Sequence, residues 1–310
     1  MTDTVHGFHH VSVISGDPQA NVDFCTDVLG LRLVKRTVNY DDKFAYHLYY
    51  GDERGERTLF TTFPYQRGAE GRLGKPQPVA TAFSVPPGAL DFWQDRLERR
   101  GFPVEDPTDR FGDTVLEFGD GDGQPLELVA TATDQTPATD AVPAERAIRD
   151  VHSVTLQSAS VFHTAATLEV LGFDLQGQEG DRVRYVKRDE DGTATAVVDL
   201  LDTDAPYGRE GSGTVHHVAF DVGEQSLSEW RARLTEAGLE PTWVKDRNYF
   251  QSVYFREPGG ILFELATTKP GLTVDESVAD LGSGLRLPPQ YEQDREMITS
   301  QLPTLELPAL

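Results

Sequence analysis

Residues 213–220 read GTVHHVAF, a short run of β-branched and apolar residues with two adjacent histidines inside it. A second run of this kind, GFHHVSV, occupies residues 7–13, and ILFEL occupies residues 261–265. Runs with this composition predict buried strands. A buried imidazole or carboxylate needs a partner. Two His-His-Val strands and one strand glutamate therefore predict a metal site with two histidines and one carboxylate.

The same succession of elements recurs four times along the chain. Each unit is predicted to contain a strand, a helix and three further strands, and the last three helices are expected at 88–100, 160–171 and 226–237. The helices end at glycines spaced 71, 71 and 66 residues apart, namely Gly30, Gly101, Gly172 and Gly238. Glycine suits the left-handed residue that ends many helices, and so regular a period indicates internal duplication.

We therefore expect an α+β fold of four βαβββ units. Their boundaries are predicted at 1–67, 79–133, 150–205 and 213–268. The remaining residues, 269–310, are expected to form a C-terminal packing arm with a helix over 291–302.

The composition excludes several classes of partner. Acidic residues outnumber basic ones 51 to 28, and the net charge of −23 disfavours binding to nucleic acid or to an anionic membrane. No apolar run approaches about 18 residues and no signal segment is recognisable, so we expect a cytoplasmic protein. The single cysteine, Cys25, excludes an internal disulfide framework. The even spread of acidic residues is typical of a halophilic protein.

Strand register tests which units pair, because a slip of one residue moves a side chain to the opposite face. Aligning the first strands of the four units gives one set of equivalent positions: His10, Ala82, Ser153 and His217. Aligning the last strands gives another: Thr61, Glu127, Asp199 and Glu264. Only the pairing of unit one with unit four collects two histidines and a carboxylate. The predicted metal ligands are therefore His10, His217 and Glu264, with the neutral Thr61 in the fourth place.

One competing ligand set stays open, because a slip of one residue would place His152 beside His217 and Glu264 instead of His10. Units two and three would form a second cleft, faced by Glu127 and Asp199. Two imidazoles and a carboxylate with vacant positions suit Fe(II), and Mn, Co, Ni or Zn are compatible with the same ligand types.

The fourfold repeat with strand histidines and a strand glutamate resembles the vicinal oxygen chelate superfamily, which includes glyoxalase I, bleomycin-resistance proteins and type I extradiol dioxygenases. A more specific resemblance, to the ring-cleaving dioxygenases of the hydroquinone 1,2-dioxygenase group, runs nearly end to end. It is carried by GFHHVS (7–12), LGLRLVK (29–35), YHLYYGDE (46–53), GTVHHVA (213–219) and YFREPGG (254–260). The resemblance implies two pseudo-symmetric half-barrel pairs, and a homo-oligomer is compatible with it.

The resemblance also implies a function. Fe(II) would be held by His10, His217 and Glu264, and a hydroquinone- or catechol-type aromatic would react with O₂. Further roles in the site would fall on four more residues: His9, His216, Arg247 and Tyr254. One of the two histidines would move the phenol proton, while the arginine and the tyrosine would hydrogen-bond substrate oxygen or developing negative charge.

Two functions of other classes stay open. A glyoxalase-like isomerase or lyase would use a divalent metal without O₂. A small-molecule binding protein, of the kind that confers resistance, would use the cleft between paired units without metal chemistry.

Overall fold

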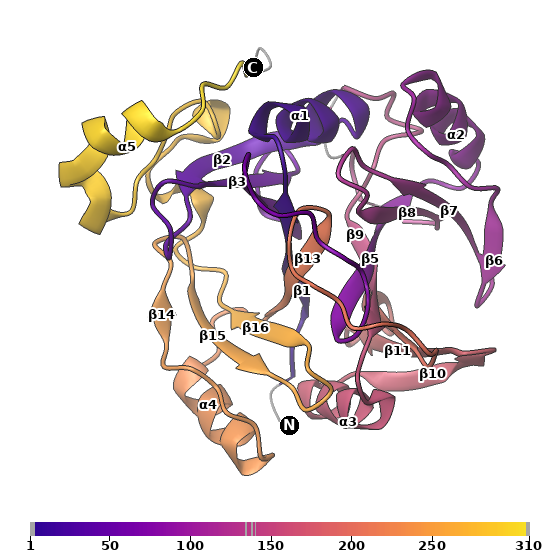
Figure 1. Ribbon diagram of the computed structural model, residues 1–310. Coiled ribbons are helices and arrows are strands. Elements are labelled where there is room, and N and C mark those ends of the chain that lie inside the picture. Colours follow the sequence, from indigo (N-terminus) through magenta and orange to yellow (C-terminus); the bar gives the residue numbers. More distant parts are fainter. Residues whose placement is uncertain (1–3, 134, 138, 140, 308–310) are drawn as a thin grey trace.

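The computed structural model describes residues 4–133, 135–137, 139 and 141–307. Within them, the strands form two sheets of eight strands each, and each sheet is built from two of the repeated units. The four first strands of the units lie in the middle of the molecule and the helices lie at its periphery (Figure 1).

The first sheet combines unit one with unit four. Unit one contributes β1 (Gly7–Ser15), β2 (Arg32–Val38), β3 (Tyr46–Gly51) and β4 (Leu59–Pro64). Unit four contributes β13 (Thr214–Asp221), β14 (Lys245–Asp246), β15 (Gln251–Arg256) and β16 (Leu262–Ala266). The strand order is β14-β15-β16-β13-β1-β4-β3-β2, with β1 and β13 antiparallel at the junction. The pairing predicted from the register of the ligands is therefore the one the sheet adopts.

The second sheet combines unit two with unit three. Unit two contributes β5 (Gln77–Val85), β6 (Thr108–Arg110), β7 (Asp113–Gly119) and β8 (Pro125–Ala130). Unit three contributes β9 (Val151–Gln157), β10 (Asp174–Glu179), β11 (Arg182–Arg188) and β12 (Ala194–Leu201). The strand order is β10-β11-β12-β9-β5-β8-β7-β6, and β5 pairs with β9 in an antiparallel manner. The two sheets are thus pseudo-symmetric half-barrels.

One helix follows the first strand of each unit. The helices α2 (Leu90–Arg99), α3 (Val161–Leu171) and α4 (Leu227–Glu236) lie within two residues of their predicted bounds. In unit one, α1 (Pro18–Asp23) is short and continues as a π-helical turn, η1 (Phe24–Val28). All four helix-ending glycines have positive φ, between +70° and +96°, as the left-handed helix end requires.

The core lies between the sheets and under the helices. Phe60 of the first sheet and Phe83 of the second meet edge to face, with ring centroids 5.4 Å apart, which is a favoured aromatic geometry. Trp93 of α2 is fully buried, and its indole N–H donates to the carbonyl oxygen of Arg146 at 2.8 Å. A buried indole needs such an acceptor, so the contact fixes α2 against the segment that leads into unit three.

The C-terminal arm runs along the free edge of the first sheet. It contains three 3₁₀ turns, η2 (Leu272–Val274), η3 (Val278–Asp280) and η4 (Pro289–Asp294), followed by α5 (Arg295–Gln301). The single helix expected over 291–302 is therefore divided between η4 and α5. Leu285 forms a bridge with Arg36 of the edge strand β2, and α5 lies near β2 in Figure 1. Covering an edge strand in this way removes a template for unwanted strand pairing.

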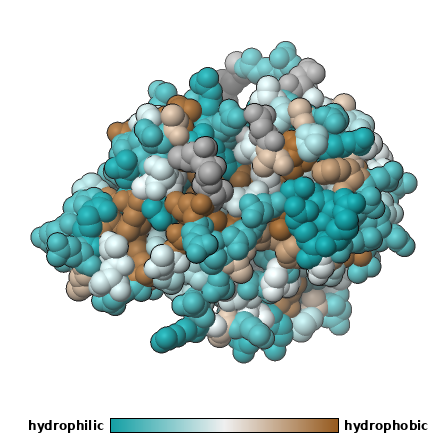
Figure 2. Space-filling view, turned by 90° about the horizontal axis from the view of Figure 1, so that it is seen from above, coloured by the Kyte–Doolittle hydropathy of each residue, from teal (hydrophilic) through white to brown (hydrophobic). Residues whose placement is uncertain are grey.

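Figure 2 shows one face of the molecule, on which hydrophilic residues predominate and hydrophobic residues form smaller groups among them. This agrees with the excess of acidic side chains in the sequence. In the described part of the chain, every helix is too short or too polar to cross a membrane.

Candidate metal centre

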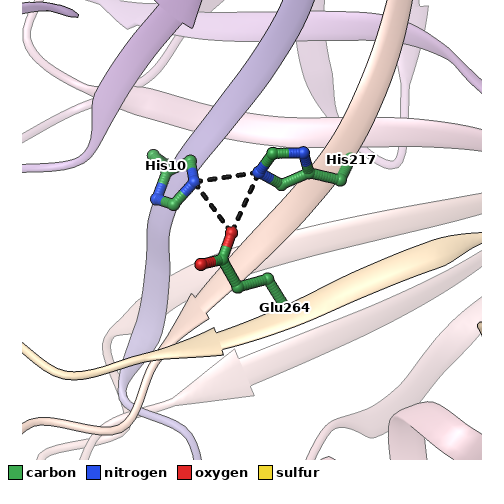
Figure 3. A group of neighbouring side chains, drawn as sticks. All are labelled: His10, His217 and Glu264. Carbon is green, nitrogen blue, oxygen red and sulfur yellow. Dashed lines mark hydrogen bonds and ion pairs between the residues drawn. The ribbon is translucent and has the colours of Figure 1, made fainter. Parts of the chain in front are cut away.

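Three strands of the first sheet each bring one side chain to a common point. His10 lies on β1, His217 on β13 and Glu264 on β16, and the three side chains converge in Figure 3. Ala219 of β13 is in register with both His10 and Glu264, so the strand pairing itself sets their approach. The predicted ligands thus come together from the first and fourth units.

The spacing of the three ligand atoms fits a metal ion. Nε2 of His10 lies 3.0 Å from Nε2 of His217, and Oε2 of Glu264 lies 3.1 Å and 2.9 Å from these two nitrogens. Ligand atoms at adjacent corners of an octahedron lie about 3.0 Å apart when the metal bonds are about 2.1 Å long. The residues His10, His217 and Glu264 are only 1%, 3% and 0% exposed, respectively. The set is therefore compact, buried and compatible with one face of an octahedron.

The electrostatics of the site also suit a cation. Both carboxylate oxygens of Glu264 are buried, and Oε2 lies beside the two imidazoles. Burial alone would raise the pKa of Glu264, but the imidazoles of His10 and His217 hold it well below its usual value. Burial lowers the pKa of His217. An ionised carboxylate beside a neutral imidazole is the protonation state that metal binding requires.

The residues before the two ligand histidines, His9 and His216, are the extra residues of two β-bulges. The β1–β13 register shifts at these two positions, so that neither has an opposite partner. A bulge re-aims a side chain that strict alternation would send to the other face. As a result, Nδ1 of His9 lies 2.8 Å from Nδ1 of His10, and Nδ1 of His216 lies 2.7 Å from Nδ1 of His217.

These contacts assign the ring protons. A ligand imidazole with a bare Nε2 carries its proton on Nδ1, so His10 donates to His9 and His217 donates to His216. His9 then carries its own proton on Nε2, which donates to the carbonyl oxygen of Thr267 at 3.1 Å. Burial, followed by the adjacent ligand imidazole, lowers the pKa of His9 to about 3 and that of His216 to about 4. Both bulged histidines are therefore neutral near pH 7.

The two bulged histidines face different spaces. His216 lines a cavity of about 460 Å³ together with both ligand histidines. His9 instead lines a crevice of about 1270 Å³ that residues of both sheets enclose. The Nε2 proton of His9 is donated to Thr267, whereas Nε2 of His216 has no hydrogen bond to any of the described residues. Of these two histidines, His216 is therefore the one that lies in the smaller cavity beside the ligands.

Arg247 and Tyr254 line the same cavity as His216. Tyr254 on β15 is in register with Glu264, and its ring centroid lies 5.7 Å from that of His217. The Arg247 guanidinium lies 5.4 Å from the Tyr254 ring centroid. Burial raises the pKa of Tyr254, so its hydroxyl keeps its proton. Burial acts to lower the pKa of Arg247, but Tyr254 and Asp41 raise it overall, and the guanidinium stays positive.

His47 is a site residue that the sequence reasoning did not identify. It lines the cavity, its Nδ1 lies 3.0 Å from the Tyr49 hydroxyl, and its Nε2 lies 3.1 Å from Oγ1 of Thr61. Oγ1 of Thr61 also lies 2.7 Å from Oγ of Ser12. The Thr61 hydroxyl is thus hydrogen-bonded to two neighbours. It is therefore not free to act as a fourth metal ligand. The signal for this group was the alternation in residues 46–50, which places His47 and Tyr49 on one face of a strand.

The corresponding region of the second sheet holds arginines in place of a metal-binding group. Glu127 accepts from Arg110 at 2.6 Å, and Asp199 accepts from Arg184 at 2.8 Å and from Arg182 at 3.0 Å. Both buried carboxylates are therefore neutralised by the chain itself.

His152 lies on β9 of this second sheet, where it is the bulged residue equivalent to His9 and His216. Among the described residues, only His10, His217 and Glu264 form a cluster suited to a metal ion. The alternative ligand set with His152 in place of His10 is therefore wrong.

The paired half-barrels and the three-ligand site define the class of protein. The family model of the glyoxalase/bleomycin resistance protein/dioxygenase superfamily matches residues 7–128 and 168–265, and the chain belongs to this superfamily. Glyoxalase I from Zea mays shares the fold, with a TM-score of 0.65 at 15% identity over 84% of this chain and 92% of that one.

Within the superfamily, several relatives that match over nearly the full length are named as ring-cleaving dioxygenases. MhqE of Bacillus subtilis (strain 168), provisionally named a ring-cleaving dioxygenase, is 41% identical over 96% of this chain and 99% of its own. The chlorohydroquinone/hydroquinone 1,2-dioxygenase of Sphingobium indicum is 38% identical over 94% of each chain. A crystal structure of a Bacillus subtilis protein, provisionally described as a dioxygenase, has a TM-score of 0.93 at 40% identity and covers both chains fully.

Proposed function

We propose that the protein is a non-haem Fe(II)-dependent ring-cleaving dioxygenase that acts on a hydroquinone- or catechol-type aromatic with O₂. The observation that carries this proposal is the buried group of His10, His217 and Glu264, which brings three potential metal-ligand atoms together. The fourth ligand position is occupied by Thr61, whose hydroxyl is hydrogen-bonded to Ser12. Its relatives over the full length are named for the cleavage of hydroquinone rings or of aromatic rings in general. When bound, Fe(II) supplies the one-electron chemistry that O₂ needs to react with an electron-rich ring.

The cavity beside the ligands supports an aromatic substrate. Its volume of about 460 Å³ is roughly three times that of a cavity of about 150 Å³ that binds benzene in another protein, so a substituted ring has room. Aromatic side chains form much of its wall: Tyr40, Tyr49, Phe63, Tyr65, Phe250 and Tyr254. Flat apolar walls with a few convergent polar groups are typical of small-molecule sites.

The polar groups around the metal centre divide into three roles. His216 would donate its Nε2 proton to a substrate oxygen and hold that oxygen beside the ligands. The positive Arg247 and the protonated Tyr254 would stabilise the negative charge that develops on oxygen when a phenol ionises and is oxidised. His9 would act as a positioning residue, because its contacts hold the ring of His10 between Thr267 and the metal position.

The two other classes of function fit the site less well. A glyoxalase-like isomerase or lyase usually takes a fourth protein ligand, and the equivalent place is held by Thr61, whose hydroxyl already contacts Ser12 and His47. A binding protein without a metal would have no use for two imidazoles and a carboxylate that converge on one buried point. The open three-ligand site therefore favours the dioxygenase.

The test is metal analysis after anaerobic purification, combined with oxygen uptake on addition of hydroquinones and catechols. We expect about one iron per chain and uptake that requires both iron and the aromatic. The matched variant His217→Ala should lose the iron, whereas His152→Ala, in the other sheet, should retain it. Bound zinc, nickel or manganese without oxygen uptake would refute the dioxygenase and favour the isomerase, and a protein that binds none of these metals would favour the binding protein.

A further inference from the structure

A buried lysine joins the C-terminal arm to the first sheet close to the site. Lys35 of β2 is 0% exposed. Its ammonium lies 2.7 Å from Oδ1 of Asp275, forms a second ion pair with Glu276, and stands 4.8 Å from the centroid of the Tyr249 ring. The arm thus supplies both carboxylates, and the sheet supplies the cation between them.

Asp275 extends this contact to the turn that precedes β15. Its Oδ2 accepts a hydrogen bond of 3.0 Å from the Tyr249 hydroxyl. Gly271, at the start of the arm, donates its backbone N–H to the Tyr249 carbonyl oxygen at 2.8 Å. Tyr249 is therefore held by the arm at both its side chain and its backbone.

Tyr249 lies inside a tight turn, 247–250, of which Arg247 and Phe250 line the proposed substrate cavity. Its N–H donates to the carbonyl oxygen of Arg247 at 2.7 Å, and the N–H of Arg247 donates to the carbonyl oxygen of Phe250 at 2.9 Å. Asn248 between them has a φ of +64°, a left-handed conformation that is uncommon outside glycine. These links make residues 247–250 one rigid piece, so the placement of Tyr249 is also the placement of Arg247 and Phe250.

The ion pairs of Lys35 with Asp275 and Glu276 fix the geometry of the arm more than they stabilise the fold. Replacing a buried ion pair by packed apolar residues is often neutral or stabilising, so a buried pair is weak evidence for a stabilising role. What the pair provides is a single arrangement, because a buried ammonium tolerates few positions for its partners. Here that arrangement locks the arm, β2 and the turn to one another.

We propose that Asp275 and Lys35 act through Tyr249 as positioning residues, by which the C-terminal arm sets the turn 247–250 over the metal centre. This inference rests on the proposed function for its catalytic consequence. The arm would then be part of the active-site architecture and would do more than cover a sheet edge.

The chain offers a matched pair of variants. Tyr249→Phe removes the hydroxyl that donates to Asp275 and leaves the ring beside Lys35. Tyr46→Phe removes another buried hydroxyl that anchors the arm, since Tyr46 donates to the carbonyl oxygen of Pro303 at 2.8 Å far along the arm from the turn. If both hydroxyls only stabilise the fold, the two variants should have the same hydrogen exchange and kcat/KM. If Tyr249 positions the turn, only Tyr249→Phe should change these properties.

We expect faster amide hydrogen exchange in residues 247–250 of Tyr249→Phe, unchanged iron content, and a fall of about tenfold in kcat/KM for the aromatic. Tyr46→Phe should match the wild type in all three. Asp275→Asn, which keeps an acceptor for Tyr249, should retain more activity than Asp275→Ala. Unaltered exchange at 247–250 in Tyr249→Phe, or an equal loss of kcat/KM in both tyrosine variants, would overturn the inference. If the wild type consumes no oxygen with these aromatics, the proposed function fails, and the exchange measurement alone still decides the positioning.

Discussion

Replacing Glu264 with glutamine should separate the functional cost of this residue from its structural cost. The carboxylate is fully buried, and the imidazoles of His10 and His217 hold its pKa well below the usual value, so the folded protein favours the ionised form. A glutamine of nearly the same shape removes this charge and its attraction to the two imidazoles. We therefore expect Glu264→Gln without metal to be modestly less stable than the wild type without metal.

With metal the difference in stability between the wild type and Glu264→Gln should widen. An ion that binds only the folded state adds about 2.7 kcal/mol when its concentration is about 100 times Kd. For a chain of 310 residues, an unfolding entropy of about 2.1 cal/mol/K per residue gives about 0.65 kcal/mol/K. The wild type should therefore gain about 4 °C in Tm at that Fe(II) concentration. Glu264→Gln has lost the only anionic ligand and should gain less than about 1 °C under the same conditions.

Anaerobic thermal unfolding with and without Fe(II), followed by circular dichroism, measures both effects. Glu127→Gln is the matched control, because Glu127 is a buried carboxylate of the second sheet that pairs with Arg110. That variant should lose stability in the absence of metal and keep the full response to Fe(II). A shift of about 4 °C in Glu264→Gln would refute its assignment as a ligand.

Two further outcomes concern the bulged histidines and the cavity. Because the folded-state pKa values of His9 and His216 are lowered to about 3 and 4, the unfolded chain binds protons more readily. Stability should be complete above about pH 6.5 and fall below it, by up to about 2 kcal/mol per histidine at pH 5; equal urea midpoints at pH 7 and pH 5 would contradict this. Tyr254→Phe should lower kcat about 100-fold with little change in KM and with iron retained, and a steady-state result in which only KM rises would show that Tyr254 acts in binding alone.

Several features could be predicted from the sequence because they depend on local periods. The four helix-ending glycines reveal the repeat, and the period of two along a strand decides which histidine of each His-His pair shares a face with the strand glutamate. Together they led to His10, His217 and Glu264 and to the pairing of unit one with unit four. These inferences needed only spacing along the chain and the rule that two histidines and a carboxylate must be in register.

The tertiary structure decided the contacts that cannot be predicted from local sequence periodicity. The bulges at His9 and His216 depend on how β1 and β13 pair, and the different surroundings of the two histidines depend on where the second sheet lies. The commitment of Thr61 to Ser12 and His47 joins three strands. The turn that carries Arg247 is held by an arm whose charges meet a lysine about 240 residues earlier in the chain. Such contacts arise between elements remote in sequence, where the packing of the whole molecule chooses the partners.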